Sequence, residues 1–326
     1  MLQGQRVPQT LLLSGPEGVG KATLARRMAA TLLGDGERIE QDDLSLPANL
    51  GVIADREKWP ADKRGDDPLL FSSHPDFLTF PPDGPLRQIS IQQMRMLKER
   101  ATLKPLKGRW RIFLIDRIDR ANEQAANSLL KTLEEPPDHL LLIATAQNAY
   151  DLLPTIRSRT VPFHLARLGD DEMRAFIRER GLDHPDRRLA LAQGSPGLAV
   201  SIDLEVYDKR RAAMWKFLEV AAGQSPFAEW AKHSESIAAR KTEKLEDYLD
   251  VLYLLIEDLV HVANGGVALR NPDLARELAA LAPNIRFEWL RKAVLKIDEL
   301  VELLRRNIQK GLALDALVLD LRGSAR

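Results

Sequence analysis

The sequence predicts an α/β domain with a parallel sheet covered by helices on both faces, followed by a small helical domain and a larger all-α domain. Up to about residue 165, short and fully apolar strands alternate with helices, which is the pattern of a parallel sheet that is buried on both faces. After that point the strand signal stops, and helical periodicity broken at Gly and Pro continues to residue 321. We therefore predict three domains, 1–165, 166–203 and 204–326.

The first predicted strand leads into a glycine-rich turn. Three leucines at 11–13 precede the turn GPEGVGK at 15–21, and a helix is indicated by apolar residues at Leu24, Met28 and Leu32. Strand, glycine turn and helix in this order are typical of a phosphate-binding P-loop. Backbone N–H groups and the positive helix end would face a phosphate, which the lysine of the turn could also reach. The candidate nucleotide-binding residues are Gly15, Gly18, Gly20, Lys21, Ala22 and Thr23.

The P-loop lacks one catalytic group. The motif has Ser or Thr after the lysine because that hydroxyl binds Mg²⁺, but this chain has Ala22. Thr23 is rotated by about 100° around the helix and is not expected to substitute. The turn could hold ATP or ADP without turnover, hold a lone phosphate or sulfate, or stay empty. The sequence leaves these alternatives open.

The stretch between residues 34 and 85 is polar and irregular. We predict one strand there, at Asp76–Phe80, and expect the rest to be an exposed insertion that is disordered in part. The later elements predicted from apolar runs and helical spacing are a helix from Ile89, a strand at Arg109–Asp116, a helix at Arg120–Pro137, and strands at Leu140–Thr145 and Thr160–Leu165.

Composition excludes several classes of protein. The 47 basic and 47 acidic residues cancel, so any contact with nucleic acid would have to be local. The chain has no cysteine, which excludes disulfides and cysteine–zinc sites. It also lacks an apolar run of about 18 residues and a signal-peptide core, so we expect a cytoplasmic protein.

The strand that follows the insertion carries a second candidate site residue. It ends in Asp116, where P-loop proteins place the Walker B carboxylate that faces Mg²⁺. The next residue in such ATPases is a glutamate that orients the attacking water, whereas this chain has Arg117. A guanidinium has no acceptor for a proton, so this position is a second indication against hydrolysis.

Two long segments identify a family resemblance. DRIDRANEQAANSLLKTLEEPP and LLPTIRSRTVPF resemble the AAA+ clamp-loader ATPases of bacterial DNA polymerase III. HPDFLTF, ISIQQMRMLKE and NIQKGLALDALVLDL extend the resemblance over nearly the whole chain. The resemblance implies an AAA+ module, a helical lid domain and a C-terminal collar domain. The implied partners are gamma/tau-type and delta-type subunits in an assembly of five, the sliding clamp, and primer–template DNA reached through that assembly.

The resemblance also assigns individual residues. Ser158–Arg159–Thr160 match the family's SRC motif, so Arg159 is the candidate arginine finger, which would act in trans on ATP bound by a neighbouring subunit. Thr145 falls at the sensor 1 position, although it could equally be an ordinary strand end. The sensor 2 arginine of hydrolysing members is absent from Gly194–Gly197, which is a third indication against hydrolysis.

This chain departs from the family at two other places. Many relatives carry a four-cysteine zinc module, and we predict no zinc and no other metal here, with the insertion Asp42–Asp67 in its place. The first strand begins at Leu11, whereas relatives have a longer lead-in that helps to cover the adenine, so either the start is shortened or Met1 is a late start.

Three functions remain open at this point. The leading hypothesis is a non-hydrolysing component of the DNA polymerase III holoenzyme and its clamp loader, which supplies Arg159 to a neighbour. The first alternative is an active AAA+ ATPase subunit of gamma/tau type. The second is a stand-alone DNA-binding P-loop protein, for which a basic run would be the contact, although we favour a solvated helix end and loop. That run consists of Lys98, Arg100, Lys104, Lys107, Arg109 and Arg111.

Overall fold

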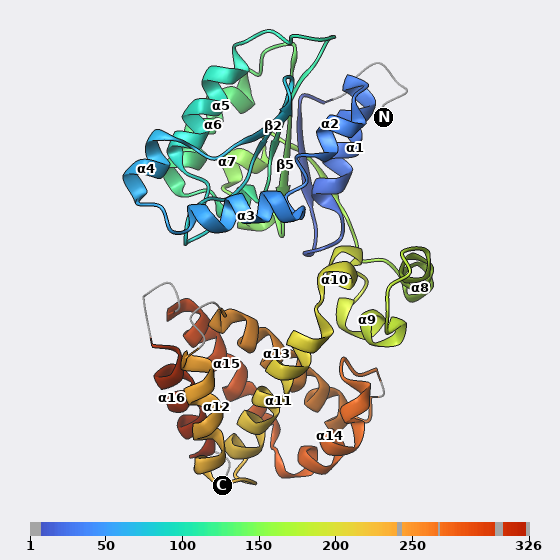
Figure 1. Ribbon diagram of the computed structural model, residues 1–326, viewed down its shortest axis with the longest axis vertical. Coiled ribbons are helices and arrows are strands. Elements are labelled where there is room, and N and C mark those ends of the chain that lie inside the picture. Colours follow the sequence, from blue (N-terminus) through green and yellow to red (C-terminus); the bar gives the residue numbers. More distant parts are fainter. Residues whose placement is uncertain (1–7, 240–242, 267, 304–308, 324–326) are drawn as a thin grey trace. The chain divides into compact units, whose positions relative to one another are not determined.

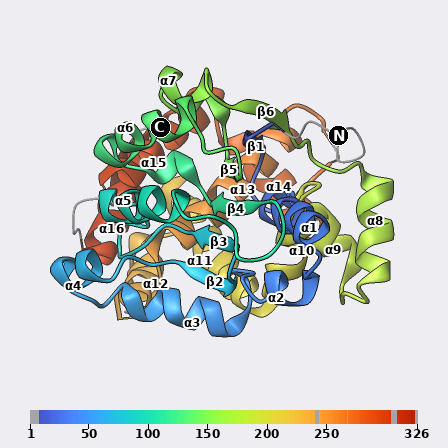
Figure 2. The ribbon, with the colours of Figure 1, turned by 90° about the horizontal axis from the view of Figure 1, so that it is seen from above.

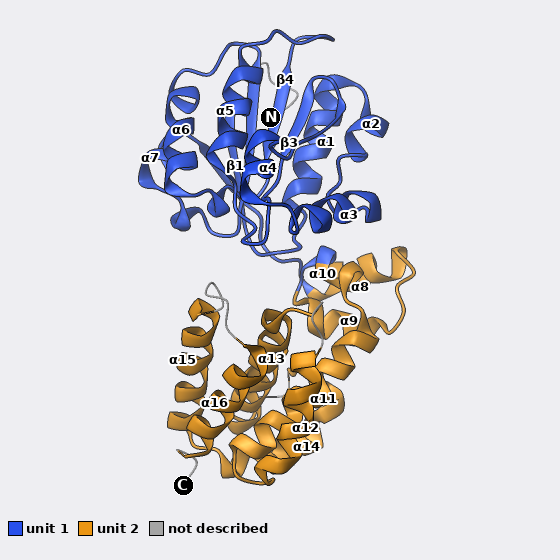
Figure 3. Ribbon diagram, turned by 60° about the vertical axis from the view of Figure 1, so that its left-hand side comes forward, with its two compact units in different colours: residues 1–169, 194–197 blue, residues 170–193, 198–326 orange. Residues whose placement is uncertain are grey.

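The chain forms two compact units (Figure 3). The computed structural model describes residues 8–239, 243–266, 268–303 and 309–323. The first unit contains the described residues up to 169 together with 194–197, and the second unit contains 170–193 and the residues from 198 onward. The three-domain division at residues 165 and 203 stays a prediction, and the lead-in at residues 1–7 lies outside the described residues.

A six-stranded sheet forms the middle of the first unit. Its strand order is β2-β3-β4-β5-β1-β6, and all pairs are parallel except β2 with β3. The strands are β1 (Thr10–Ser14), β2 (Phe71–His74), β3 (Phe77–Phe80), β4 (Arg111–Ile115), β5 (Leu140–Ala146) and β6 (Val161–His164). The five strands predicted from apolar runs are confirmed, and β2 is an addition to them.

Helices cover both faces of this sheet. Figure 1 shows α5 and α6 on one side of the strands and α1 and α2 on the other. Leu12 of β1 packs into the core under α5 and α6, whereas Leu11 and Leu13 pack into the core under α1 and α2. Successive strand residues point to opposite faces, so a strand buried on both faces is apolar at every position. The helices of this unit are α1 (Lys21–Leu33), α2 (Gly36–Glu40), α3 (Pro47–Arg56), α4 (Ala61–Asp66), α5 (Ile91–Ala101), α6 (Glu123–Glu134) and α7 (Pro154–Arg157), with 3₁₀ turns at Ile118–Arg120 and Ala149–Asp151.

Helix α1 packs on the sheet through buried alanines and through part of its predicted apolar face, because Met28 and Leu32 contact the core. Leu24 is 40% exposed, whereas Ala25 and Ala29 are fully buried. Small side chains let the helix approach the sheet closely. The same face buries Arg26, whose guanidinium pairs with Glu40 of α2 at 3.0 Å.

Many side chains of the stretch between residues 34 and 85 are exposed, as predicted, but the expectation of partial disorder is wrong. The segment folds into α2, α3, α4 and β2 (Figure 2). Each of the first two helices buries one isoleucine, Ile39 in α2 and Ile53 in α3. Helices of five and ten residues with one apolar anchor each are too short to show helical periodicity, which explains the error.

A buried ion pair fastens the insertion to the rest of the unit. The Arg56 guanidinium at the end of α3 donates to both carboxylate oxygens of Asp83, at 3.1 and 2.8 Å. The two side chains are only 5% and 7% exposed. Arg87 adds a second link, an ion pair of 2.7 Å with Glu57. These contacts, rather than apolar area alone, hold the insertion against the loop that precedes α5.

The second unit contains only helices among its described residues. Its longest helix, α13, buries Leu245, Leu249, Leu252, Leu255 and Leu259. None of the helices in the part of the chain that the structure describes is long and apolar enough to span a membrane. The helices are α8 (Asp170–Glu179), α9 (Pro185–Ala192), α10 (Pro196–Ser201, which begins in the first unit), α11 (Leu204–Ala221), α12 (Phe227–Ala239), α13 (Leu245–Ala263), α14 (Ala275–Leu281), α15 (Phe287–Leu303) and α16 (Lys310–Arg322), with 3₁₀ turns at Pro272–Leu274 and Ala282–Asn284. Helix α16 covers most of the segment NIQKGLALDALVLDL, of which residues 307 and 308 lie outside the described residues.

Candidate nucleotide site and arginine finger

The glycine turn joins β1 to α1 as the P-loop prediction requires. Gly15 has φ +144°, and a Cβ at this position would lie 2.2 Å from the carbonyl oxygen of Leu165. No side chain fits there, so the close passage of residue 165 fixes a glycine at the start of the turn. Gly20 has φ +95° and begins helix α1.

Lys21 is folded back onto its own turn. Its ammonium group donates to the carbonyl oxygens of Gly15 at 2.7 Å and Pro16 at 2.6 Å. Burial lowers the pKa of Lys21, the charge of Arg117 lowers it further, and the charge of Asp116 opposes the shift. The Lys21 ammonium group therefore binds carbonyl oxygens of its own turn, whereas the lysine of an active P-loop is directed toward phosphate.

The two residues after the lysine lie on different sides of α1. Ala22 is half-buried and packs against the core under this helix, and Thr23 is exposed to solvent. Neither therefore directs a hydroxyl into the turn, as expected from their positions around the helix.

Asp116 and Thr145 lie side by side at the ends of β4 and β5. The Thr145 hydroxyl donates to the Asp116 carboxylate at 2.6 Å and accepts from the backbone N–H of Arg117 at 2.8 Å. Thr145 is fully buried. The structure thus brings the Walker B candidate and the sensor 1 candidate together. The positive charge of Lys21 acts on the Asp116 carboxylate.

Burial raises the pKa of the Asp116 carboxyl above its ordinary value of 3.8, and the Thr145 hydrogen bond and the charges of Arg117 and Lys21 oppose this shift. The folded state therefore binds more protons than the unfolded state, and the protein loses stability as pH rises from 3.8 through the raised value.

Asn at position 116 keeps the acceptor for Thr145 but does not titrate. Relative to the wild type, Asp116→Asn is expected to gain thermal stability as pH rises from about 4 to about 7. Scanning calorimetry at several pH values measures this, with exposed Asp138→Asn as the control, and a difference that stays constant with pH would contradict it.

Arg117 stands where a water-orienting carboxylate would be needed. Its backbone is left-handed, with φ +58°, and its guanidinium forms an ion pair with Asp119 at 3.2 Å. The side chain is 21% exposed, and its charge acts on both Lys21 and Asp116. The site therefore contains two cations, Lys21 and Arg117, beside the carboxylates of Asp116 and Asp119.

The backbone of Gly197 packs directly on the P-loop. Its N–H donates to the carbonyl oxygen of Gly18 at 2.7 Å. A Cβ on Gly197 would lie 2.9 Å from that oxygen and 3.0 Å from the Gly18 Cα. The position where the resemblance places a sensor arginine therefore has no room for any side chain without a shift of the P-loop.

Arg159 lies apart from these residues, after helix α7. Its carbonyl oxygen accepts from the Thr10 hydroxyl at the first residue of β1, at 2.7 Å, whereas the P-loop follows the last residue of that strand. The guanidinium pairs with Glu134 at 2.5 Å, and the side chain of Arg159 is 33% exposed. The sequence pointed to this arginine but gave no sign of its pairing with Glu134, although both lie in the motifs that carry the resemblance.

The basic run lies around the end of α5 and the loop before β4. Arg111 is buried 3.7 Å from Asp76, whose carboxylate also accepts the backbone N–H groups of Leu106 and Lys107. Lys98, Arg100, Lys104, Lys107 and Arg109 are exposed. Five of the six cations are thus solvated, as favoured from the sequence.

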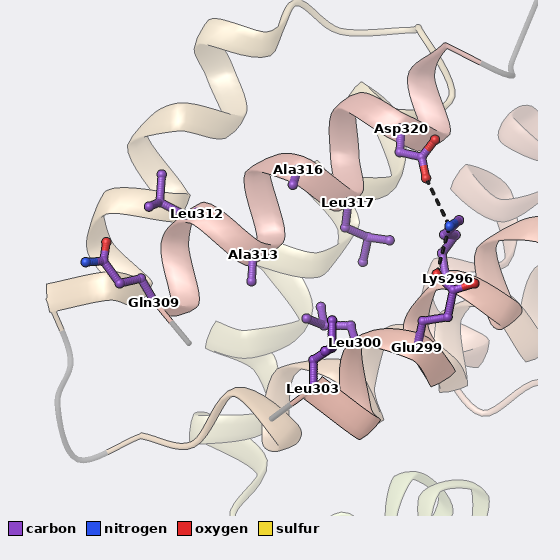
Figure 4. Close-up of a pocket in the computed structure, with 10 residues that line it drawn as sticks. All are labelled: Lys296, Glu299, Leu300, Leu303, Gln309, Leu312, Ala313, Ala316, Leu317 and Asp320. Atoms are coloured by element: carbon purple, nitrogen blue, oxygen red, sulfur yellow. Dashed lines mark hydrogen bonds and ion pairs between the residues drawn. The ribbon is translucent and has the colours of Figure 1, made fainter. Parts of the chain in front are cut away.

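The second unit contains a separate groove between α15 and α16 (Figure 4). Its volume is about 570 Å³, and Lys296 and Asp320 approach to 3.8 Å at one end. None of the site residues predicted from the sequence lines it. Its apolar lining is Leu300, Leu303, Leu312, Ala313, Ala316 and Leu317.

Comparisons with known proteins agree with the predicted resemblance. The profile of the family described as DNA polymerase III, delta subunit, matches residues 69–169, which include β3 to β6, Asp116 and Arg159. DNA polymerase III subunit delta′ of Pseudomonas aeruginosa is 28% identical over 226 residues, 67% of this chain and 64% of that protein. Subunit tau of Escherichia coli is 28% identical over 60% of this chain and 29% of that protein. In sequence, the chain is similar to subunits of DNA polymerase III.

Further similarities involve related proteins. Subunit gamma of Buchnera aphidicola is 29% identical over 53% of this chain and 42% of that protein. Among solved structures, a gamma subunit-related protein of Thermotoga maritima matches 98% of this chain and 96% of its own length, with 17% identity and a TM-score of 0.43. The RuvB branch migration motor of that organism covers 82% of it, with 13% identity and a TM-score of 0.37. The matched part spans less than two thirds of each of the sequence relatives named here.

Proposed function

We propose that this chain is a delta-prime-type clamp-loader subunit that does not turn over ATP at its own P-loop. It supplies Arg159 in trans to a neighbouring gamma/tau-type ATPase subunit while the sliding clamp is loaded on primed DNA. The observation that carries the first half of this proposal is Arg117, a cation paired with Asp119 directly after the Walker B carboxylate. It can neither accept a proton nor align an attacking water.

Two further features of the site support the absence of turnover. Ala22 offers no hydroxyl to Mg²⁺, and exposed Thr23 does not replace it. Gly197 lies so close to Gly18 that a sensor arginine could not be accommodated in this arrangement. Three separate contributions to γ-phosphate cleavage are therefore missing: a metal ligand, a water-orienting group and a phosphate sensor.

The position of Arg159 supports action on another subunit. Its backbone is bonded to the start of β1, and the P-loop begins after the fifth residue of that strand. Four steps along a strand, at roughly 3.3 Å each, separate the two ends by about 13 Å. The Arg159 backbone therefore lies at the end of β1 that is opposite the P-loop of the same subunit. This position suits a group that acts on a neighbouring subunit.

The wider assembly is part of the same proposal. The all-α C-terminal domain would form a collar with gamma/tau-type and delta-type subunits in a heteropentamer, and DNA would be reached through that assembly. ATP or ADP could bind without turnover, and no zinc is proposed because the chain contains no cysteine.

Hydrolysis by the isolated chain tests the proposed lack of turnover. Purified protein and Lys21→Ala are expected to release phosphate from ATP at the same background rate, because the wild type lacks three groups that act on the γ-phosphate. Any binding of a fluorescent nucleotide is expected to be independent of Mg²⁺, because Ala22 offers the metal no ligand. Turnover that Lys21→Ala abolishes would overturn the proposal.

An active subunit of gamma/tau type is the second candidate. It is favoured by one observation, since tau and gamma relatives match this chain at 28–29% identity, as delta′ does at 28%. Turnover that depends on Lys21 in the same assay would establish this candidate instead. Arg117 makes it the weaker of the two.

A further inference from the structure

The Arg159 side chain is held by its own domain through Glu134, the last residue of α6. One terminal nitrogen of the guanidinium pairs with the Glu134 carboxylate at 2.5 Å. The other donates to the carbonyl oxygen of Thr155 at 2.8 Å and to the Ser158 hydroxyl at 3.3 Å. The Arg159 backbone is fixed as well, because its N–H donates to the carbonyl oxygen of Ile156 at 3.0 Å.

The donors of this guanidinium are directed into the subunit. An arginine has five N–H donors and no acceptor. Both terminal nitrogens have partners, and Nε is buried without a hydrogen-bond partner. To contact a phosphoryl group on another subunit, the guanidinium would have to leave Glu134, since carboxylate and phosphate oxygens bind the same donors.

We infer that Glu134 is a latch for the arginine finger: it keeps Arg159 docked in the isolated subunit and gives it up when a neighbour's nucleotide replaces the carboxylate. This inference rests on the proposed role of Arg159 in trans. It assigns Glu134 a positioning role that acts through Arg159, without contact to nucleotide.

The geometry makes this latch weak enough to release. The side chains of Arg159 and Glu134 are 33% and 47% exposed, so water screens their attraction. The buried Nε without an acceptor further disfavours the docked position, because burial removes its bond to water. Such a contact is expected to change the affinity of assembly by about two- to fivefold, which is the range of exposed ion pairs.

The test uses the full chain with the gamma/tau-type and delta-type subunits of the same organism. A non-hydrolysable ATP analogue is present throughout. The fluorescence anisotropy of the labelled chain measures the concentration that half-saturates assembly. Glu134→Gln is expected to lower this concentration about two- to fivefold. Glu135→Gln is the matched control, since it removes the same charge at the adjacent exposed residue and is expected to leave the concentration unchanged.

A second arm separates the latch from a general charge effect. In an Arg159→Ala background, Glu134→Gln is expected to have no effect on assembly, since no guanidinium remains to be released. If Glu134→Gln weakens assembly, matches Glu135→Gln, or acts equally in the Arg159→Ala background, the latch is wrong. That result leaves the finger itself intact, because the finger is judged separately by the loss of ATP hydrolysis in Arg159→Ala.

Discussion

Arg159→Ala is expected to lower ATP hydrolysis about 10³-fold or more at the subunit site that receives the finger. An arginine in this role stabilises the negative charge that spreads over the transferring phosphoryl oxygens, and alanine leaves that charge without a partner. Arg159→Lys is expected to lose most of the activity too, because an ammonium cannot reproduce the planar pair of donors. The measurement is DNA-stimulated phosphate release by the assembly with sliding clamp and primed DNA.

Arg157→Ala is the matched control for this experiment. It removes a guanidinium two residues away, one that stacks on the Tyr150 ring at 4.7 Å. Assembly should be verified for both variants by size-exclusion chromatography, so that a lost subunit is not read as lost catalysis. Unchanged hydrolysis by the assembled Arg159→Ala protein would remove the basis for action in trans.

Arg56→Ala is expected to lower the free energy of unfolding by about 3–5 kcal/mol, because it leaves the Asp83 carboxylate buried and unpaired. The side chains are 5% and 7% exposed, and Asp83 accepts from two nitrogens of this guanidinium. Denaturant unfolding followed by circular dichroism measures the change. Loss of ellipticity in the native baseline is also expected, since α3 and α4 would lose their main link to the loop before α5.

Lys58→Ala provides the comparison for Arg56→Ala, since Lys58 pairs with Asp55 at 3.0 Å but both side chains are over 70% exposed. An exposed pair of this kind contributes about 0–1 kcal/mol. The double variant Arg56→Met with Asp83→Leu should recover much of the loss, because it removes both buried charges together. Similar small effects for Arg56→Ala and Lys58→Ala would show that the buried pair does not hold the insertion.

The Arg56–Asp83 pair also bears on the zinc module that the resemblance implies for many relatives. Without cysteine, the insertion has no thiolate ligands with which to close its loop around a metal. Here three short helices, of which only α2 and α3 bury one or two side chains each, are joined to the domain by charge pairs.

The sheet and the P-loop could be predicted because their signals are local. The strands β1, β3, β4 and β5 are buried on both faces, so runs such as Leu140–Ala146 are almost entirely apolar. The glycine turn is equally local in sequence, because its glycines lie within six residues and include positive φ values at Gly15, Gly18 and Gly20. Asp116 became a candidate as the residue that ends an apolar strand, whereas Thr145 became a candidate only through the family resemblance.

The remaining features depend on contacts between distant residues. Arg56 and Asp83 are separated by 27 positions, and neither side chain follows a periodic pattern. The contact of Gly197 with Gly18 requires two glycines to meet across the fold, and a sequence reader sees only a missing arginine. The docking of Arg159 on Glu134 likewise needed the spatial closeness of two motifs that the sequence presents in separate segments.

The hydrogen bond from Gly197 to Gly18 has a practical consequence for dissecting the protein. The chain leaves the first unit at residue 170, returns for residues 194–197, and leaves again at 198, so no single cut separates the units. A fragment that stops at residue 169 loses the Gly197 N–H group, which donates to the Gly18 carbonyl oxygen. A fragment that stops at residue 197 retains α8 and α9 but lacks the rest of the second unit. An isolated nucleotide-binding half would be better obtained by grafting the four returning residues onto position 169 through a short glycine–serine bridge.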